Sequence, residues 1–233
     1  MLGIVAALSW ELKSLTRETI APGAWKAISP QVLAALSGIG AESADDAAAL
    51  LIGQGATALI SWGYAAALDK GLKAGSLVLP ERVIGAGGES YAVDAEWHQR
   101  LYLAAAYNVP VRIGALVQSE AVVKTAAEKR ALAERTGAVA ADMESAAHAR
   151  AAARHGLPFV AVRSIIDTAS TDIPETVLQA LDAHGGLDAA KLLRGVGSAP
   201  ADWIKMLRLC IQFSAAQKTL KKAKRFVLEN SPA

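Results

Sequence analysis

The sequence predicts one large α/β domain built on a largely parallel sheet, and three observations lead to that class. Short apolar runs alternate with segments of helical pattern along most of the chain. The apolar runs are nearly continuous rather than alternating, as in strands that are covered on both faces. Of the 233 residues, 53% are hydrophobic and 5% aromatic, so small aliphatic side chains dominate a core that is large enough for one domain.

The individual strands and helices follow from the same alternation. The predicted strands are Gly3–Leu8, Val32–Leu36, Ala56–Trp62, Leu77–Val83, Val111–Val117, Val139–Ala141 and Phe159–Ile166. The predicted helices between them are Glu11–Ile20, Ala41–Gln54, Ala95–Tyr107, Thr125–Thr136 and Ser145–His155. Gly137 and Gly156 follow two of these helices, at positions where glycine commonly ends a helix.

The C-terminal part of the chain departs from this alternation. Residues 173–197 are predicted to form short helices or turns, and residues 201–228 one long helix. That helix is apolar early and basic late, with a net charge of +5 over residues 201–229. Such a helix can lie on an anionic membrane, or it can pack on the domain with a solvated basic end. We therefore divide the chain into a domain of residues 1–198 and a C-terminal helical segment of residues 199–233.

Composition excludes several classes of protein. A formal net charge of +2 gives no reason to expect nucleic acid as a partner. Cys210 is the only cysteine, which excludes a disulfide framework and a thiolate metal cluster and fits a reducing cytosol. The apolar start lacks a basic residue before it and is soon followed by Glu11, so we expect a buried first strand rather than a signal peptide. The four histidines show no metal-ligand spacing, and His148 and His155 are expected on a helix surface.

Acidic residues stand where two successive apolar runs end. Asp142 and Glu144 flank Met143 after one run, and Asp167 ends the next. Open α/β sheets bind ligands at the carboxyl ends of their strands. Two carboxylates there suit cleavage of a glycosidic bond, because one can hold sugar hydroxyls while the other handles a proton on the leaving group. The structural alternatives are acids that complement a helix dipole and, for Asp167, a helix-capping or turn residue.

Three more positions at predicted strand ends are candidates for the same site. Glu11 could orient or deprotonate an attacking water, or it could be an ordinary acid on a helix surface. Gly40, in Gly38-Ile-Gly40, could turn a backbone N–H toward an anion or water. Gly63 would allow close approach of a ligand, and Trp62 or Tyr64 could either stack on a ring or pack in the core.

Arg163 lies inside an apolar strand and therefore needs a partner. A structural pair with a carboxylate is the first interpretation of this residue, and a substrate contact is the second.

Together these segments resemble the nucleoside phosphorylase superfamily, and more narrowly its methylthioadenosine/S-adenosylhomocysteine nucleosidases. The motifs that carry the resemblance are Gly3-Ile-Val-Ala-Ala-Leu-Ser-Trp-Glu11, Leu36-Ser-Gly-Ile-Gly40, Val139-Ala-Ala-Asp-Met-Glu-Ser145 and Val162-Arg-Ser-Ile-Ile-Asp167. The resemblance implies a three-layer α/β/α domain with a mixed, largely parallel twisted sheet. It also implies an enzyme that cleaves the N-glycosidic bond of a 5′-modified adenosine and needs no metal or organic cofactor.

The resemblance also implies roles for individual residues. Glu144 would hold the ribose hydroxyls with Met143 against the sugar, Asp167 would assist protonation of the purine, and Glu11 would position the nucleophile. Val122 would occupy a base-binding position where the nucleosidases often carry an aromatic residue.

The nucleophile itself is left open by these residues. Tyr64, Ala66 and Ala67 depart from the family's small-residue pattern, and bulk there would crowd the nucleophile pocket. Water is favoured over phosphate because Glu11 stands where phosphorylases use arginine, although the family name implies phosphate as co-substrate.

The tail resembles hopanoid-associated phosphorylases, to which release of adenine from adenosylhopane in hopanoid synthesis is assigned. The matching segments are Asp172-Ile-Pro-Glu175, Leu178–Ala180, Gly186-Leu-Asp188 and the basic helix. This resemblance implies a cytoplasmic homodimer that could meet the inner membrane face through the helix. A methylthioadenosine/S-adenosylhomocysteine nucleosidase, or a non-catalytic nucleoside- or lipid-binding module, are the alternatives.

Overall fold

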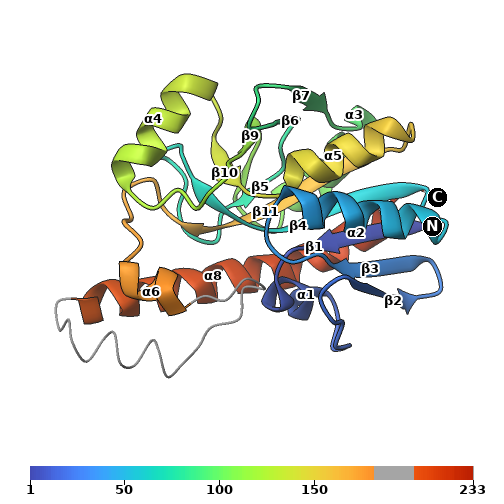
Figure 1. Cartoon of the computed structure of the whole chain (residues 1–233), viewed down its shortest axis with the longest axis horizontal. Coiled ribbons are helices and arrows are strands. Elements are labelled where there is room, and N and C mark those ends of the chain that lie inside the picture. Colours follow the sequence, from blue (N-terminus) through green and yellow to red (C-terminus); the bar gives the residue numbers. More distant parts are fainter. Residues whose placement is uncertain (181–201, 233) are drawn as a thin grey trace.

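A mixed sheet of 11 strands forms the centre of the protein, as a computed structural model of residues 1–180 and 202–232 shows (Figure 1). The strands are β1 Leu2–Ala6, β2 Ala24–Ser29, β3 Val32–Leu36, β4 Ala58–Ala67, β5 Leu77–Val78, β6 Arg82–Ile84, β7 Ser90–Ala92, β8 Val111–Arg112, β9 Ala115–Gln118, β10 Ala140–Asp142 and β11 Phe159–Asp167. The main order is β2-β3-β1-β4-β10-β9-β6-β7, and β11 joins β4 to β5, which pairs in turn with β8. Six of the ten pairings are parallel, which confirms the mixed, largely parallel sheet.

The long strand β4 is the hub of the sheet. It pairs in parallel with β1 and β11 and antiparallel with β10. Because β1, β4 and β11 run in the same direction, their carboxyl ends meet at one edge of the sheet. Glu11 follows the first of these strands, and Asp167 ends the last. The topology therefore brings acids from distant parts of the chain to the same side of the sheet.

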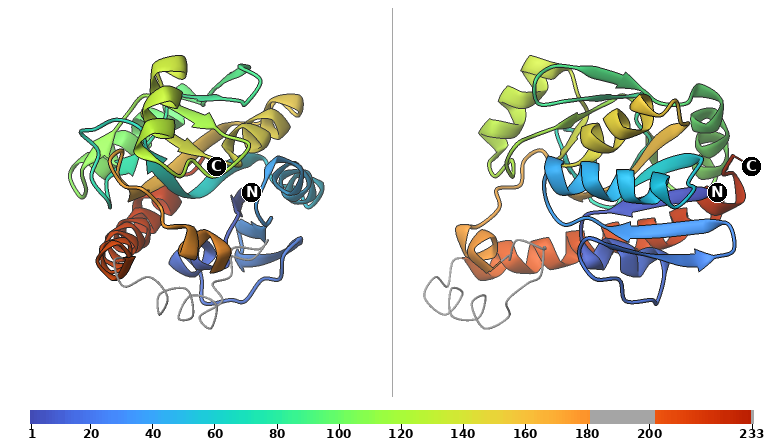
Figure 2. Two further views of the ribbon diagram at one scale, coloured as in Figure 1. Left: turned by 60° about the vertical axis from the view of Figure 1, so that its left-hand side comes forward. Right: turned by 45° about the vertical axis from the view of Figure 1, so that its right-hand side comes forward.

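Helices cover both faces of the sheet, which confirms the layered α/β architecture (Figures 1 and 2). The helices are α1 Ser9–Leu15, α2 Ala41–Gly53, α3 Ala95–Ala106, α4 Ala126–Thr136, α5 Ser145–Arg154, α6 Glu175–Ala180 and α8 Asp202–Glu229. α2 and α5 pack against each other, and α8 packs against β11, α1 and α3. Gly137 and Gly156 both have positive φ after α4 and α5, as their predicted capping positions require.

Two predicted strands are each divided in the structure. The run Leu77–Val83 becomes β5 and β6, separated by a segment that contains Pro80, which has no N–H for a strand ladder. The run Val111–Val117 becomes β8 and β9, separated at Gly114, whose φ of 143° is a glycine conformation. The strands β2 and β7 were not predicted, because both lie toward the edges of the sheet, are partly exposed and lack a continuous apolar run.

The second half of α8 is part of the domain's core. Leu220, Ala223 and Val227 are fully buried against the body of the protein. The predicted segment 173–197 and the tail motif Gly186-Leu-Asp188 lie partly or wholly outside the described residues, and so does the division of the chain near residue 198. No helix in residues 1–180 and 202–232 has both the length and the apolar character needed to cross a membrane.

Candidate active site

Glu11 is a buried carboxylate held by three backbone N–H groups. It lies in the first turn of α1, where Oε2 accepts from Ala7 and Leu8 at 3.0 and 2.9 Å. Oε1 accepts from the backbone N–H of Tyr64 on β4 at 2.8 Å. Burial raises the pKa of Glu11 to about 7, while the charge of Arg163 and the three N–H donors oppose that rise. The carboxyl group is therefore poised to change its protonation state near neutral pH.

Glu144 is the second buried carboxylate, at the junction of β10 and α5. Its Oε1 accepts the backbone N–H of Gly40 at 3.1 Å, and Gly40 has the positive φ of 102° that favours glycine. Burial raises the pKa of Glu144 to about 8, and the charges of Asp142 and Glu11 add to the rise. The structure thus brings Glu11 and Glu144 into electrostatic contact although they are far apart in sequence.

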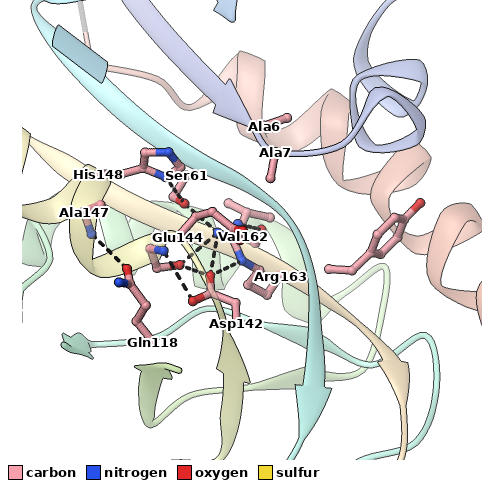
Figure 3. A network of polar contacts seen from close by, with 12 residues as sticks. Ala6, Ala7, Ser61, Gln118, Asp142, Glu144, Ala147, His148, Val162 and Arg163 are labelled. Atoms are coloured by element: carbon pink, nitrogen blue, oxygen red, sulfur yellow. Dashed lines mark hydrogen bonds and ion pairs between the residues drawn. The ribbon is translucent and has the colours of Figure 1, made fainter. Parts of the chain in front are cut away.

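A buried polar network around Arg163 lies near Glu144 (Figure 3). Arg163 forms an ion pair with Asp142 at 2.7 Å and donates to the hydroxyls of Ser61 and Ser145 at 2.6 and 2.8 Å. Ser145 also donates to Asp142. The structure therefore supports the first interpretation of Arg163, a structural pair with a carboxylate.

The expectation that His148 lies on a helix surface is wrong. Its side chain is 1% exposed, and Nδ1 contacts the Ser61 hydroxyl at 2.6 Å (Figure 3). Since Ser61 already accepts from Arg163, its own hydroxyl hydrogen is available for Nδ1. Burial, followed by the charge of Arg163, lowers the pKa of His148 to about 3, so the ring is neutral. The run of buried alanines on both sides of His148 was the signal for burial, because small residues let a helix pack closely.

Asp167 ends β11 and is buried against a lysine that the sequence did not single out. Lys129, on α4, forms a buried ion pair with Asp167. Burial raises the pKa of Asp167, and the ammonium group of Lys129 opposes that rise. Lys129 stands between Glu128 and Arg130 in a charged helix, so its local sequence resembles that of a solvent-exposed position.

Trp62 and Tyr64 lie in the middle of β4, which continues to Ala67 beyond the predicted strand end at Trp62, and both side chains are buried. Trp62 is 1% exposed and its indole N–H donates to Ser14 at 2.9 Å, so the suggestion that it stacks on a ligand ring is wrong. The ring of Tyr64 packs against Phe213 of α8 with ring centroids 5.6 Å apart. The side chain of Tyr64, which was expected to crowd the nucleophile pocket, is therefore directed at α8. The backbone N–H of Tyr64 donates to Glu11.

The remaining predicted residues differ in exposure. Met143 is half-buried beside Glu144, and Val122 is exposed in the loop between β9 and α4. A cavity of about 730 Å³ lies beside β6 and β9, lined among others by Arg82, Gln118 and Arg135. It includes none of the predicted site residues.

Among the described residues, no group of three or more His, Cys, Asp or Glu side chains could hold a metal ion.

The fold is that of the nucleoside phosphorylases and nucleosidases. The chain belongs to the phosphorylase superfamily, whose family model matches residues 2–196. A search of curated protein sequences found no matching relative.

Solved structures of low sequence identity share the fold over almost the whole chain. The 5′-methylthioadenosine/S-adenosylhomocysteine nucleosidase of Neisseria meningitidis, in complex with methylthio-immucillin-A, has a TM-score of 0.70 and 20% identity, covering 98% of this chain and 96% of its own. The S-adenosylhomocysteine nucleosidase of Streptococcus pyogenes has a TM-score of 0.71 and 19% identity, with coverages of 100% and 97%. The futalosine hydrolase of Helicobacter pylori has a TM-score of 0.73 and 16% identity, with coverages of 99% and 97%.

Proposed function

We propose that this protein cleaves the N-glycosidic bond of a 5′-modified adenosine and releases adenine. The observation that carries the proposal is the pairing of Glu11 and Glu144. Two buried carboxyl groups with pKa values raised to about 7 and about 8 face the same site at the carboxyl ends of the strands. Perturbed carboxyl groups of this kind cluster where proton transfer is catalysed. Membership of the phosphorylase superfamily supports the same chemistry.

In this proposal each acid acts on a different part of the substrate. Glu144 holds the ribose hydroxyls, with Met143 against the sugar, while Asp167 faces the purine and assists its protonation. As the glycosidic bond breaks, positive charge develops on the ribose ring, and the buried carboxylates favour that charge. Glu11 takes a proton from the attacking water, a task for which a pKa near the operating pH is well suited. None of these steps requires a metal or an organic cofactor.

Water is the nucleophile that the charges favour. When ionised, Glu11 and Glu144 would repel a phosphate dianion. Arg163, whose forked guanidinium could bind phosphate, is instead bonded to Asp142, Ser61 and Ser145. We therefore infer hydrolysis, with phosphorolysis as the alternative.

An assay of adenine release tests the activity and the nucleophile together. The purified protein is incubated with several 5′-substituted adenosines, with and without phosphate, and both adenine and the sugar product are measured. Adenine and free sugar without phosphate would support hydrolysis, whereas ribose 1-phosphate formed only with phosphate would show phosphorolysis. No release of adenine from any substrate would contradict the proposed activity and leave a non-catalytic binding module as the better description.

The finer proposal is that the 5′ substituent is a polycyclic lipid, as in adenosylhopane. The supporting observation is the solvent face of α8, where Leu207 and Ile211 are 64% and 63% exposed and lie one helical turn apart. Further along the same helix, the exposed basic side chains are Lys218, Lys221, Lys222 and Arg225. Apolar side chains followed by a basic stretch suit a helix at an anionic membrane surface, where a cytoplasmic enzyme would meet a lipid substrate.

Point substitutions are the right test of membrane contact, because removing α8 would also remove core residues such as Leu220 and Val227. Leu207→Ser with Ile211→Ser should lower sedimentation with anionic liposomes about tenfold or more, since each buried aliphatic side chain contributes about 1.5–3 kcal/mol. Cys210→Ser with Ser214→Ala, at exposed positions on the same helix, is the matched control. Equal liposome binding by the two double variants would show that Leu207 and Ile211 of α8 do not contact the membrane. In the adenine assay, a preference for methylthioadenosine or S-adenosylhomocysteine over lipid-linked adenosine would favour the nucleosidase alternative.

A homodimer is the expected assembly, and an exposed apolar group on α3 and near β8 supports it. Its members are Tyr102, Leu103, Tyr107 and Ile113, with Tyr107 92% exposed. Light scattering of the wild type and of Tyr107→Glu would test this, and a monomeric wild type would contradict it.

A further inference from the structure

Lys129 is buried at a position where its charge is fully coordinated. Its side chain is 0% exposed, and its ammonium group has three hydrogen-bond acceptors. One is the carboxylate of Asp167, and the others are the backbone carbonyls of Thr168 at 3.0 Å and Thr171 at 2.7 Å. An ammonium group has three N–H donors, so all of them are used within the protein.

The segment after Asp167 is attached to the start of α4 by further hydrogen bonds. The backbone N–H of Ala126 donates to Asp172 at 2.8 Å, and that of Ile173 donates to the carbonyl of Lys124 at 2.9 Å. The first turn of α4 and the chain that follows β11 therefore form one connected unit around the ion pair. Burying a lysine is costly unless its partners are in place, so this unit fixes the orientation of Asp167.

We propose that Lys129 is a positioning residue for the base side of the site, which holds Asp167 in place and supplies the proton that Asp167 passes to the purine. The inference deepens the proposed function and rests on it. In the ion pair the ammonium group of Lys129 donates a hydrogen bond to the carboxylate of Asp167. An ionised carboxylate cannot donate, so a proton must reach it before or during departure of the base.

The transfer leaves no charge unaccounted for. A proton moves from Nζ of Lys129 to Asp167, and the ion pair becomes a neutral amine beside a neutral acid. The carboxyl O–H then breaks as an N–H bond forms on the purine, and the electron pair of the breaking glycosidic bond stays with adenine. Adenine leaves neutral, Asp167 is again a carboxylate, and Lys129 regains a proton from water. On the opposite side, the attacking water gives its proton to Glu11, which then releases it to solvent and so balances the proton that Lys129 takes up.

The other charged and titratable groups around β11 bind partners other than Asp167. On β11 itself, Arg163 is paired with Asp142. From β4 and α1, Tyr64 packs on Phe213, and Glu11 is held by three N–H groups. From α8, the neutral amide of Gln212 donates to Thr171. Among the described residues, Lys129 is the charged partner that acts on the pKa of Asp167.

The test compares pH profiles of adenine release for Lys129→Met, Lys129→Arg and the control Arg130→Met, an exposed position on the same helix. In Lys129→Met, the only proton available to the purine on this side is the one that Asp167 itself carries. In alkaline solution Asp167 loses that proton. Its rate relative to wild type should therefore be at least about tenfold lower at pH 8.5 than at pH 5.5, the ratio expected for one pKa unit. An equal loss at both pH values would indicate a structural role alone and overturn the proposal.

Lys129→Arg separates charge from proton supply. A guanidinium keeps the positive charge but holds its proton at every pH of the assay. We expect a folded protein with a lower melting temperature than the wild type, because the guanidinium is larger than the buried ammonium group, and a rate lower by about tenfold or more, the minimum typical of lost proton transfer. A wild-type rate would overturn the proposal, even if Lys129→Met failed to fold. Arg130→Met should match the wild type throughout. A wild type that releases no adenine would instead contradict the proposed function itself.

Discussion

Gly63 makes room for the carboxyl group of Glu11. A Cβ atom at position 63 would lie 2.2 Å from Oε1 of Glu11, far inside van der Waals contact. The next residue, Tyr64, donates its backbone N–H to the same oxygen. The strand β4 thus approaches α1 closely enough to hold the acid, and only a residue without a side chain permits that approach.

Gly63→Ala should displace Glu11 and lower the rate of adenine release about 100-fold, the effect expected for misplacing a catalytic group by about 1 Å. Steady-state kinetics on a cleaved 5′-substituted adenosine provides the measurement. Gly53→Ala is the matched control, because a Cβ there meets nothing within 4 Å. Full activity in Gly63→Ala would show that the position of Glu11 is not critical.

Glu11→Gln keeps the size of the side chain but removes the base. The rate should fall by about two to four orders of magnitude, the contribution typical of general acid–base catalysis. In the wild type, the rate should rise as pH passes through about 7, because Glu11 must be ionised to accept a proton. If that rise were retained in Glu11→Gln, another group would have to be the base.

In the proposed mechanism Asp167 is the acid on the base side of the site, and Asp167→Asn removes it. We expect a loss of about two to four orders of magnitude in the rate of adenine release. The affinity for a non-cleavable adenosine analogue, measured by calorimetry, should change far less than the rate. A rate close to that of the wild type would exclude Asp167 from the proton transfer.

Arg163→Met should act on stability rather than on substrate binding. It leaves Asp142 buried without its partner, which typically costs about 3–5 kcal/mol. Urea unfolding gives the free energy of unfolding, and the double variant with Asp142→Leu should recover part of the loss. A stable Arg163→Met protein with a much higher KM would instead support the second interpretation, that Arg163 contacts substrate.

Stability should fall as pH rises from about 6.5 to about 8.5. Burial raises the pKa values of Glu11 and Glu144 from 4.5 to about 7 and about 8, so the folded protein retains protons that the unfolded chain has already released. Folding is therefore penalised as pH increases, until both groups are ionised in the folded state. His148, with its pKa lowered from 6.5 to about 3, penalises folding only toward lower pH.

Glu144→Gln isolates one of these contributions. Its melting temperature should depend less on pH between 6.5 and 8.5 than that of the wild type, because one of the two titrating acids is gone. Differential scanning calorimetry at several pH values in this window is sufficient. An unchanged slope would mean that Glu144 does not titrate there.

Much of the fold could be predicted because local pattern decides it. Continuous apolar runs predicted strands such as β1, β3 and β11, and glycines marked the ends of α4 and α5. The same pattern placed Glu11 beyond β1 and Asp167 at the end of β11, two strands that run parallel to β4 and end on one side of the sheet, whereas Glu144 follows β10, which is antiparallel to β4. The strands β2 and β7 were missed since edge strands need no continuous apolar run.

The sequence by itself determined the class of fold and singled out Glu11, Glu144 and Asp167 as the candidate acids of the site. Only the tertiary structure decided which charged side chains are buried and with which partners. Lys129 meets Asp167 across 38 positions, and His148 meets Ser61 across 87. No local period encodes such pairs, because burial of a polar side chain depends on what distant elements place around it. For that reason the lysine partner of Asp167, and the buried neutral histidine bound to Ser61, appear only once the chain is folded.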